Sequence, residues 1–194
     1  MGGFVEFYND PIKVDKYEDM CVGYDGTELY QVLDKHLENG SRLLELGCGP
    51  GNDLDYFNEK YKVTGSDLSD EFLLRCKKRF PDMSFIKQDA ISINTDQKFD
   101  CVFSNKVLHH LNTKKLEASL KRQQAVIKPN GIFAHTFWIG DKEFMMEDML
   151  FVFHNRENLL KLIAKYFSIL EVYAYKELEE GDSIFVLAAN DHAT

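Results

Sequence analysis

The sequence is poor in several kinds of residue and pattern, and each shortage removes a class of function. Basic residues are outnumbered, with 23 Lys and Arg against 32 Asp and Glu and a formal net charge of −9. Binding to nucleic acid requires clustered positive charge, so this balance argues against a nucleic-acid partner. Apolar runs long enough to span a membrane are missing, and residues 1–10 lack the basic start and apolar middle of a signal peptide. We therefore expect a cytoplasmic protein with a small-molecule substrate and no membrane association.

Patterns for disulfides, metals and hydrolytic triads are also absent. The four cysteines are far apart and form no C-x-x-C pair, and the six histidines show no H-E-x-x-H spacing. This usage indicates reduced thiols and predicts no metal site. No G-x-S-x-G nucleophile elbow is present, which argues against a serine hydrolase triad.

What remains fits one globular domain over residues 1–194. With 44% hydrophobic and 28% charged residues, the chain can bury a full core. Short apolar strands alternate with helical segments after residue 40, which predicts an open α/β sheet with helices on both faces. Residues 1–40 show no strand alternation and are expected to form a helical cap, including a helix at residues 29–37 packed on the sheet edge.

The most informative stretch is residues 42–57, which read RLLELGCGPGNDLDYF. An apolar strand leads into glycines at alternate positions, Gly47, Gly49 and Gly51, and a helix follows. Glycine tolerates positive φ and lets a ligand approach the backbone, while the helix N-terminus presents unpaired N–H groups. The turn is expected to bind an anionic or carboxylate-bearing ligand. It differs from the dinucleotide fingerprint G-x-G-x-x-G, because Pro50 fixes φ where that loop needs freedom.

The next strand ends in a second chemical signal. Residues 61–67 are β-prone and finish at Asp67, about sixteen positions beyond the last glycine. A carboxylate at the tip of the second strand of a doubly wound sheet accepts hydrogen bonds from ribose hydroxyls. Asp67 is therefore a candidate ligand residue. The alternative is that Asp67 caps the following helix, for which Ser69 also provides a cap signal.

Four motifs in order resemble the class I S-adenosylmethionine-dependent methyltransferases. They are E-L-G-C-G-P-G at residues 45–51, Q-D-A at 88–90, F-D-x-V-x-x-x-x-V-L-H-H-L at 99–111 and K-P-x-G at 128–131. The resemblance covers most of residues 40–190. It implies a Rossmann-like, open twisted sheet of seven strands in the order 3-2-1-4-5-7-6, with strand 7 antiparallel. It also implies S-adenosylmethionine as cofactor, S-adenosylhomocysteine as product and a small-molecule methyl acceptor.

The resemblance assigns a set of cofactor-binding residues along the strand ends. Leu68 would lie against the adenine ring, Asp89 would accept the adenine amino group, and the N–H of Ala90 would meet the ring. Asn105 follows the fourth strand, beside the methionine part of the cofactor. The full set is Glu45, Gly47, Cys48, Gly49, Gly51, Asp67, Leu68, Asp89, Ala90 and Asn105. Among the N-terminal tyrosines, Tyr17 or Tyr24 could touch the cofactor or could simply be half-buried in the cap.

Histidines are the candidate catalytic residues. His109 and His110 follow the fourth strand, where the methyl group is expected to point, and an imidazole can accept a proton at neutral pH. Adjacent residues on a turn project differently, so only one of the pair is expected to face the pocket, and both could serve only to shape it. His135 and His154 are weaker candidates for the base.

Residues 140–154 are irregular in pattern and rich in Phe and Met, and are expected to form a lid over the substrate, with fixed core as the alternative. The Y-x-x-x-K spacing of Tyr56 and Lys60 is typical of short-chain dehydrogenases, but it lies directly after the glycine turn and is interpreted as coincidence. Two functional alternatives stay open: an NAD-dependent oxidoreductase and a non-catalytic, cofactor-binding regulatory domain.

Overall fold

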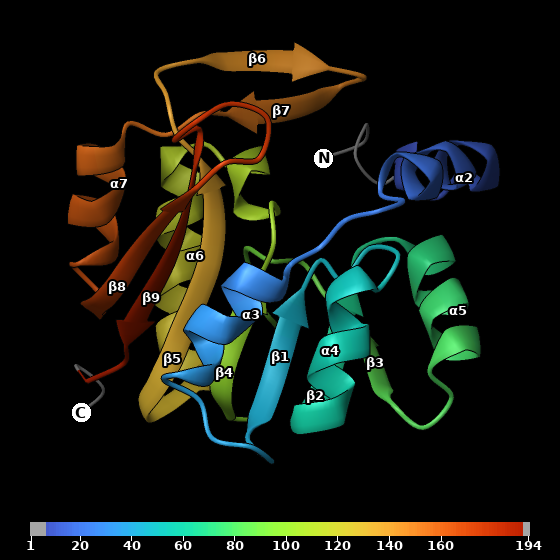
Figure 1. The fold of residues 1–194 in the computed structure, drawn as a ribbon, viewed down its shortest axis with the longest axis horizontal. Coiled ribbons are helices and arrows are strands. Elements are labelled where there is room, and N and C mark those ends of the chain that lie inside the picture. The colour runs from blue at the N-terminus through green and yellow to red at the C-terminus, as the bar shows by residue number, and fades with distance from the viewer. Residues whose placement is uncertain (1–6, 192–194) are drawn as a thin grey trace.

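The fold is a twisted sheet with helices on both faces and a separate hairpin above it (Figure 1). A computed structural model describes residues 7–191. The helices are α2 (Pro11–Met20), α3 (Thr27–Asp34), α4 (Asn52–Lys60), α5 (Asp70–Arg79), the 3₁₀ turn η1 (Leu108–His110), α6 (Thr113–Val126) and α7 (Arg156–Ile163). The strands are β1 (Arg42–Leu46), β2 (Lys62–Asp67), β3 (Ser84–Lys87), β4 (Phe99–Ser104), β5 (Ile127–Trp138), β6 (Glu143–Met146), β7 (Met149–Val152), β8 (Ser168–Tyr175) and β9 (Ser183–Ala189).

The strand order confirms the predicted topology. The sheet runs β3-β2-β1-β4-β5-β9-β8, with β1 to β5 parallel and β9 antiparallel to both of its neighbours. Since β6 and β7 pair only with each other, β8 and β9 are the sixth and seventh strands of the sheet, and the order is the expected 3-2-1-4-5-7-6. All five parallel strands end at one edge, which faces the hairpin in Figure 1.

Alternating side chains along each strand build two separate cores. On β1, Leu43 packs in the cluster that contains residues of α3, α4 and α5, whereas Leu44 packs in the cluster with residues of α6 and α7. Helix α3 therefore covers a face of the sheet, where Leu33 joins Leu43 and Phe185, and the expected position on the sheet edge is wrong. Four of the eight residues of α3 are buried, which is typical of a helix that packs on the face of a sheet.

The segment expected to be irregular is in fact a regular β-hairpin. Strands β6 and β7 are joined by Glu147 and Asp148, which have φ of 49° and 60°. Two successive left-handed residues make a tight hairpin turn of the kind that usually contains Asn or Gly. Because neither is present here, the sequence carried no clear turn signal. Whether this hairpin moves as a lid stays a prediction.

The Y-x-x-x-K pair has a structural partner on α3. The Tyr56 and Lys60 side chains both donate hydrogen bonds to the Asp34 carboxylate, and the Tyr61 hydroxyl donates a third at 2.6 Å. These contacts hold α3 to α4 and lower the pKa of Asp34, against the effect of partial burial. Among residues 7–191, no helix has the length and apolar character needed to cross a membrane.

Candidate active site

The glycine turn after β1 has the left-handed backbone that its sequence predicts. Gly47, Gly49 and Gly51 have φ of 66°, 48° and 83°. A Cβ on Gly47 would also lie 2.6 Å from a methyl group of Val107, so no side chain fits there. Gly51 is the N-terminal cap of α4, and its conformation turns the chain from the strand into the helix.

Asp67 connects this turn to the tip of β2. One carboxylate oxygen accepts the Gly49 N–H at 3.0 Å and the other accepts the Ser69 N–H at 2.8 Å. Helix α5 is capped by the Ser69 hydroxyl, which accepts the Phe72 N–H at 3.0 Å, so Asp67 is not its cap. Burial raises the pKa of Asp67, and the backbone hydrogen bonds oppose that shift.

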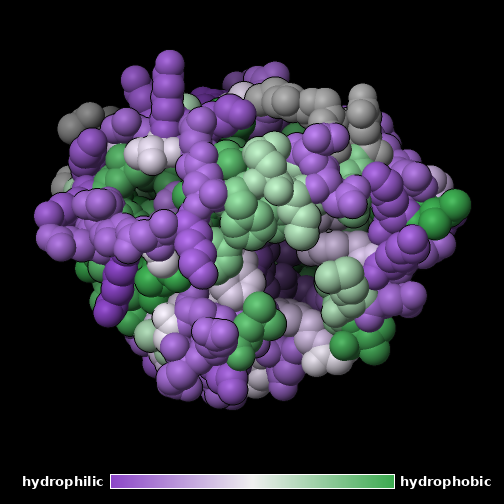
Figure 2. Space-filling model, turned by 90° about the horizontal axis from the view of Figure 1, so that it is seen from above, coloured by the Kyte–Doolittle hydropathy of each residue, from purple (hydrophilic) through white to green (hydrophobic). Residues whose placement is uncertain are grey.

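A cavity of about 400 Å³ opens at the carboxyl ends of the strands, beneath the hairpin. Figure 2 shows this end of the molecule with a central hollow bordered by apolar side chains. Five of the predicted cofactor residues line the cavity: Gly47, Asp67, Leu68, Asp89 and Ala90. The hairpin contributes Met145, Met149 and Leu150, and η1 contributes His110. Side chains from distant parts of the sequence therefore meet at the edge where α/β sheets bind ligands.

The other predicted cofactor residues do not line this cavity. Gly49 and Gly51 form the turn behind it, and the Cys48 side chain is buried in the core near Cys76. Glu45 and Asn105 belong instead to a polar cluster beside the turn. That cluster centres on Asp53, a residue that the sequence analysis did not select.

Glu45 and Asp53 form a buried pair of carboxyl groups. Asp53 accepts hydrogen bonds from the hydroxyls of Tyr30 at 2.7 Å and Tyr24 at 3.3 Å, and the Asn105 amide donates to Tyr24 at 2.6 Å. Glu45 is 1% exposed, and its Oε2 has no hydrogen-bond partner among residues 7–191. Burial, followed by the charge of Asp53, raises the pKa of Glu45 well above its usual value, and burial also raises the pKa of Asp53.

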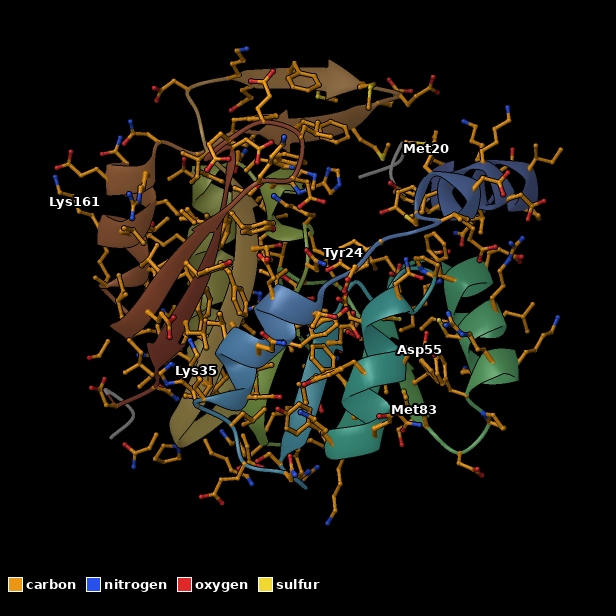
Figure 3. The ribbon with its side chains drawn as sticks, in the orientation of Figure 1. Met20, Tyr24, Lys35, Asp55, Met83 and Lys161 are labelled. Atoms are coloured by element: carbon orange, nitrogen blue, oxygen red, sulfur yellow. The ribbon has the colours of Figure 1, made fainter. Side chains whose placement is uncertain are left out.

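Of the two N-terminal tyrosines considered above, one belongs to this cluster, and contact of either with the cofactor stays a prediction. Tyr24 lies over the strand ends, where Figure 3 labels it, and touches Asp53 and Asn105. Tyr17 instead packs against Tyr8 and Phe72 on α5. Asp53 had no distinct sequence signal, because an acidic residue in the first turn of a helix is common as a complement to the helix dipole.

The two neighbouring histidines differ in their surroundings. His110 lines the cavity, and its Nδ1 donates to the Leu150 carbonyl of the hairpin at 2.7 Å. His109 is 4% exposed, and its Nδ1 has no partner among the described residues. Burial lowers the pKa of both, and for His109 the charges of His110, Lys106 and His154 lower it further. Both imidazoles are therefore neutral at pH 7, and of the pair only His110 lines this cavity.

The weaker histidine candidates are also buried and neutral. His135 lies within β5, with its Nδ1 2.6 Å from the Ser104 hydroxyl, and burial lowers its pKa to about 3. Burial lowers the pKa of His154 to about 4. No group of three or more Cys, His, Asp or Glu side chains in the described part of the chain could hold a metal ion.

Comparisons with known proteins agree with this geometry. Residues 43–131 match the family described as a methyltransferase domain. The match covers slightly less than half of the chain. The resemblance to class I S-adenosylmethionine-dependent methyltransferases is thereby confirmed, and the match covers the glycine turn, Asp67, Asp89 and both histidines.

Curated relatives match over the same region. Trans-aconitate 2-methyltransferase of Escherichia coli strain 55989 is 32% identical over 78 residues, which cover 39% of this chain and 31% of that protein. The enzyme of the same name from Methylobacterium nodulans is 34% identical over 74 residues, covering 37% and 29%. The matches thus span about a third of the length of these relatives.

Solved methyltransferase structures share the whole fold. The 1,6-didemethyltoxoflavin-N1-methyltransferase of Burkholderia thailandensis superposes with a TM-score of 0.79 at 21% identity, covering 96% of this chain and 84% of that one. An S-adenosylmethionine-dependent methyltransferase of Clostridium acetobutylicum gives 0.76 at 15% identity, covering 90% and 98%. At sequence identities of 15% and 21%, these superpositions establish a shared fold alone.

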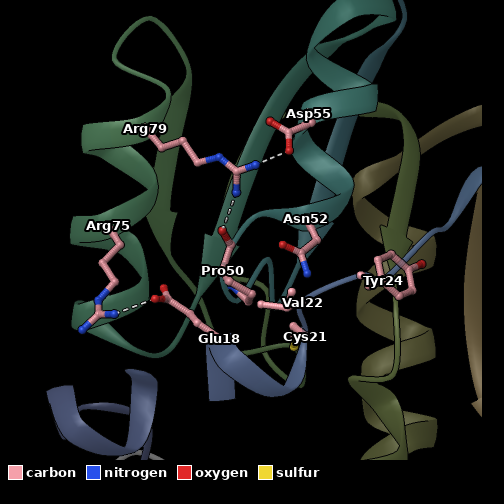
Figure 4. A pocket seen from close by; sticks show the side chains of 10 residues that line it. Glu18, Cys21, Val22, Tyr24, Pro50, Asn52, Asp55, Arg75 and Arg79 are labelled. Atoms are coloured by element: carbon pink, nitrogen blue, oxygen red, sulfur yellow. Dashed lines mark hydrogen bonds and ion pairs between the residues drawn. The ribbon is translucent and has the colours of Figure 1, made fainter. Parts of the chain in front are cut away.

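A second pocket of about 410 Å³ lies behind the glycine turn (Figure 4). It lies between α2, α4 and α5 and is polar. Its charged groups are already paired, since Arg75 binds Glu18 at 2.7 Å and Arg79 binds Asp55. We assign it no part in the site at the strand ends.

The buried acid pair predicts an unusual pH dependence of stability. Folded Glu45 holds a proton at pH values where an unfolded glutamate, with a pKa near 4.3, has lost it. The folded state then binds more protons than the unfolded state, so the free energy of unfolding falls as pH rises above that value. Replacing Glu45 with Gln removes this loss. Thermal melts should show the advantage of Glu45→Gln over the parent protein growing between about pH 5 and pH 8.

The matched control is Glu157→Gln, which alters an exposed pair with Lys161 on α7. Its melting temperature should stay near that of the parent at every pH. If the Glu45→Gln and parent curves run parallel, the two carboxyl groups do not share a proton.

Proposed function

We propose that the chain is a methyltransferase that uses S-adenosylmethionine to methylate a small-molecule acceptor. The proposal rests on one observation: Gly47, Asp67 and Asp89 line the same cavity at the carboxyl ends of the parallel strands. Each residue offers what one part of this cofactor needs, and the family match and the fold support the same reading. We propose methyl transfer as the activity of the whole protein, and a small molecule as its acceptor and partner.

The residues present fit the cofactor. Asp67 would accept the ribose hydroxyls, and Asp89 with Ala90 would meet the adenine edge, with Leu68 against its face. The missing Cβ of Gly47 leaves the backbone open to close approach. The buried Glu45 Oε2, which lacks a partner among residues 7–191, can accept a hydrogen bond from the amino group of the cofactor. An NAD-dependent oxidoreductase fits less well, because Pro50 interrupts the dinucleotide spacing.

When bound, this cofactor supplies a methyl carbon activated by a positively charged sulfur. The protein then has three tasks: to align the acceptor, to exclude water and to remove a proton where the acceptor carries one. The apolar hairpin residues Met145, Met149 and Leu150 cover the cavity and limit the access of water. We propose that residues 140–154 act as the lid of this single domain and that residues 1–40 act as its cap.

His110 is the better candidate for the base. Its Nδ1 carries the proton that it donates to the Leu150 carbonyl, so Nε2 is the basic nitrogen. Its lowered pKa keeps the imidazole neutral, and therefore able to accept a proton, at pH 7. His109 would support His110 by packing, since their ring centroids are 4.0 Å apart.

The proposed activity can be tested directly. Purified protein is incubated with S-adenosylmethionine and fractionated metabolite extracts, and formation of S-adenosylhomocysteine is measured. The proposal expects acceptor-dependent formation of product. Binding of the cofactor with no turnover on any fraction would favour the non-catalytic regulatory alternative. Binding of reduced nicotinamide cofactor instead would favour the oxidoreductase.

Replacing Asp67 with Ala should weaken binding of S-adenosylmethionine by roughly 10- to 150-fold, since a hydrogen bond to a charged group contributes about 1.5–3 kcal/mol. Isothermal titration calorimetry measures the change. Asp70→Ala is the matched control, because Asp70 lies three residues on and its carboxylate pairs with the exposed Lys87 ammonium. Equal affinities of parent and Asp67→Ala would remove the ribose assignment.

If His110 is the base, His110→Ala should cut kcat by about 10²- to 10⁴-fold with little change in cofactor affinity. Because burial lowers its pKa, the acidic limb of the kcat profile should lie below about pH 6.5 and disappear in the variant. His109→Ala, the control, should retain that limb. A fully active His110→Ala enzyme would show that alignment alone carries the reaction.

A further inference from the structure

A lysine side chain occupies an aromatic site at the ends of β4 and β5. Lys106 follows β4 with φ of 53°, a left-handed conformation that is costly for a residue other than glycine. Its N–H is held by the Thr136 hydroxyl at 2.8 Å. Its Nζ lies 3.7 Å from the ring centroid of Trp138 and 5.2 Å from that of Tyr175. The fold thus imposes a strained backbone at the residue that brings an ammonium group to this place.

The ammonium charge is only partly compensated. Nζ donates to the Ser183 hydroxyl at 2.5 Å, but its carboxylate partner, Glu177, is 3.7 Å away. Charge-assisted hydrogen bonds are usually 2.7–2.9 Å long. Burial lowers the pKa of Lys106 to about 8, against the effects of Glu177 and Asp182. Glu177 is also 27% exposed and lies in the loop between β8 and β9, so a better placed anion could replace it.

Polar atoms near Lys106 also lack partners. The Tyr175 hydroxyl, His109 Nδ1 and His154 Nε2 are buried and form no hydrogen bond with any residue that the structure describes. The charges of Lys106 and His154 both lower the pKa of His109. Buried polar groups are almost always satisfied, and a ligand bound beside Lys106 would complete those that it reached.

We propose that Lys106, Trp138 and Tyr175 form a subsite that binds a carboxylate of the methyl acceptor, which makes the acceptor an anionic organic acid. This proposal rests on the proposed function and names its substrate class; the subsite adjoins the cavity at the strand ends through Val107, which follows Lys106 and lines that cavity. The carboxylate takes the place of Glu177 against the ammonium and accepts a hydrogen bond from the Tyr175 hydroxyl. The subsite anchors the acceptor; Lys106 is a specificity-determining residue.

The chain contains a single tryptophan, so Trp138 fluorescence reports on this subsite alone. Three probes of one shape and different charge are titrated with S-adenosylhomocysteine present and absent: benzoate, benzamide and benzylamine. Benzoate should change the emission saturably, at concentrations roughly tenfold or more below those needed for the neutral or cationic probe. Calorimetric binding of S-adenosylhomocysteine is measured separately, so failure of the proposed function is distinguished from failure of the subsite.

Two substitutions should move benzoate affinity in opposite directions. Lys106→Met should weaken it by roughly 10- to 150-fold through loss of a charge-assisted contact. Glu177→Gln should strengthen it, because the competing carboxylate is gone. Lys106→Arg retains charge and should retain most of the affinity if Lys106→Met misfolds. Lys161→Met, in an exposed pair on α7, is the control and should change nothing.

Three results would contradict the proposed carboxylate subsite. Preference for benzylamine, with affinity raised by Lys106→Met and lowered by Glu177→Gln, would show a subsite for cationic acceptors. Equal responses to all three probes would show an apolar site without charge selection. No saturable response to benzoate in protein that binds S-adenosylhomocysteine would show that the Lys106 cluster is structural.

Discussion

The hydrogen bond from the Gly49 N–H to the Asp67 carboxylate fixes the geometry of the whole site. It connects the turn after β1 to the tip of β2, two elements that are separated by the entire α4 helix. With the turn held there, Gly51 starts α4 in a direction that brings Asp53 beside Glu45. The same carboxylate holds the Ser69 N–H, which sets the start of α5. A ligand that bound Asp67 would therefore contact the residue on which both helices are aligned.

The two sides of the proposed site differ in the charged groups that they hold. Along β1 to β3 the strand ends present carboxyl groups, with Glu45, Asp67 and Asp89 close to the glycine turn. Beyond β4 the prominent charge is the Lys106 ammonium, held by Trp138. We propose that the acidic side receives the cationic cofactor and the basic side an anionic acceptor. Such a division would place the anionic acceptor near the cationic sulfur of the cofactor, and their attraction would favour binding of both.

Local signals in the sequence were sufficient for the turn, the second strand and the α/β class, whereas the strand order followed from the family resemblance. Gly47 and Asp67 were found because their chemistry follows directly from strand ends and backbone conformation. The Asp53 cluster was missed because its partners lie 23 to 52 residues away and meet only through the topology. The hairpin was missed because Glu147 and Asp148 adopt left-handed conformations without Gly or Asn. Lys106 was missed for the same reason, since nothing local marks its positive φ.

The central claim is that the cavity at the ends of β1, β2 and β3 binds S-adenosylmethionine. A crystal structure of the protein grown with S-adenosylhomocysteine tests it most directly. The account predicts the ribose hydroxyls on the Asp67 carboxylate, the adenine ring beside Leu68 and Asp89, and the amino acid end toward Glu45. Density for the ligand in the polar pocket behind the glycine turn, or anywhere that leaves Asp67 without a contact to it, would contradict the account.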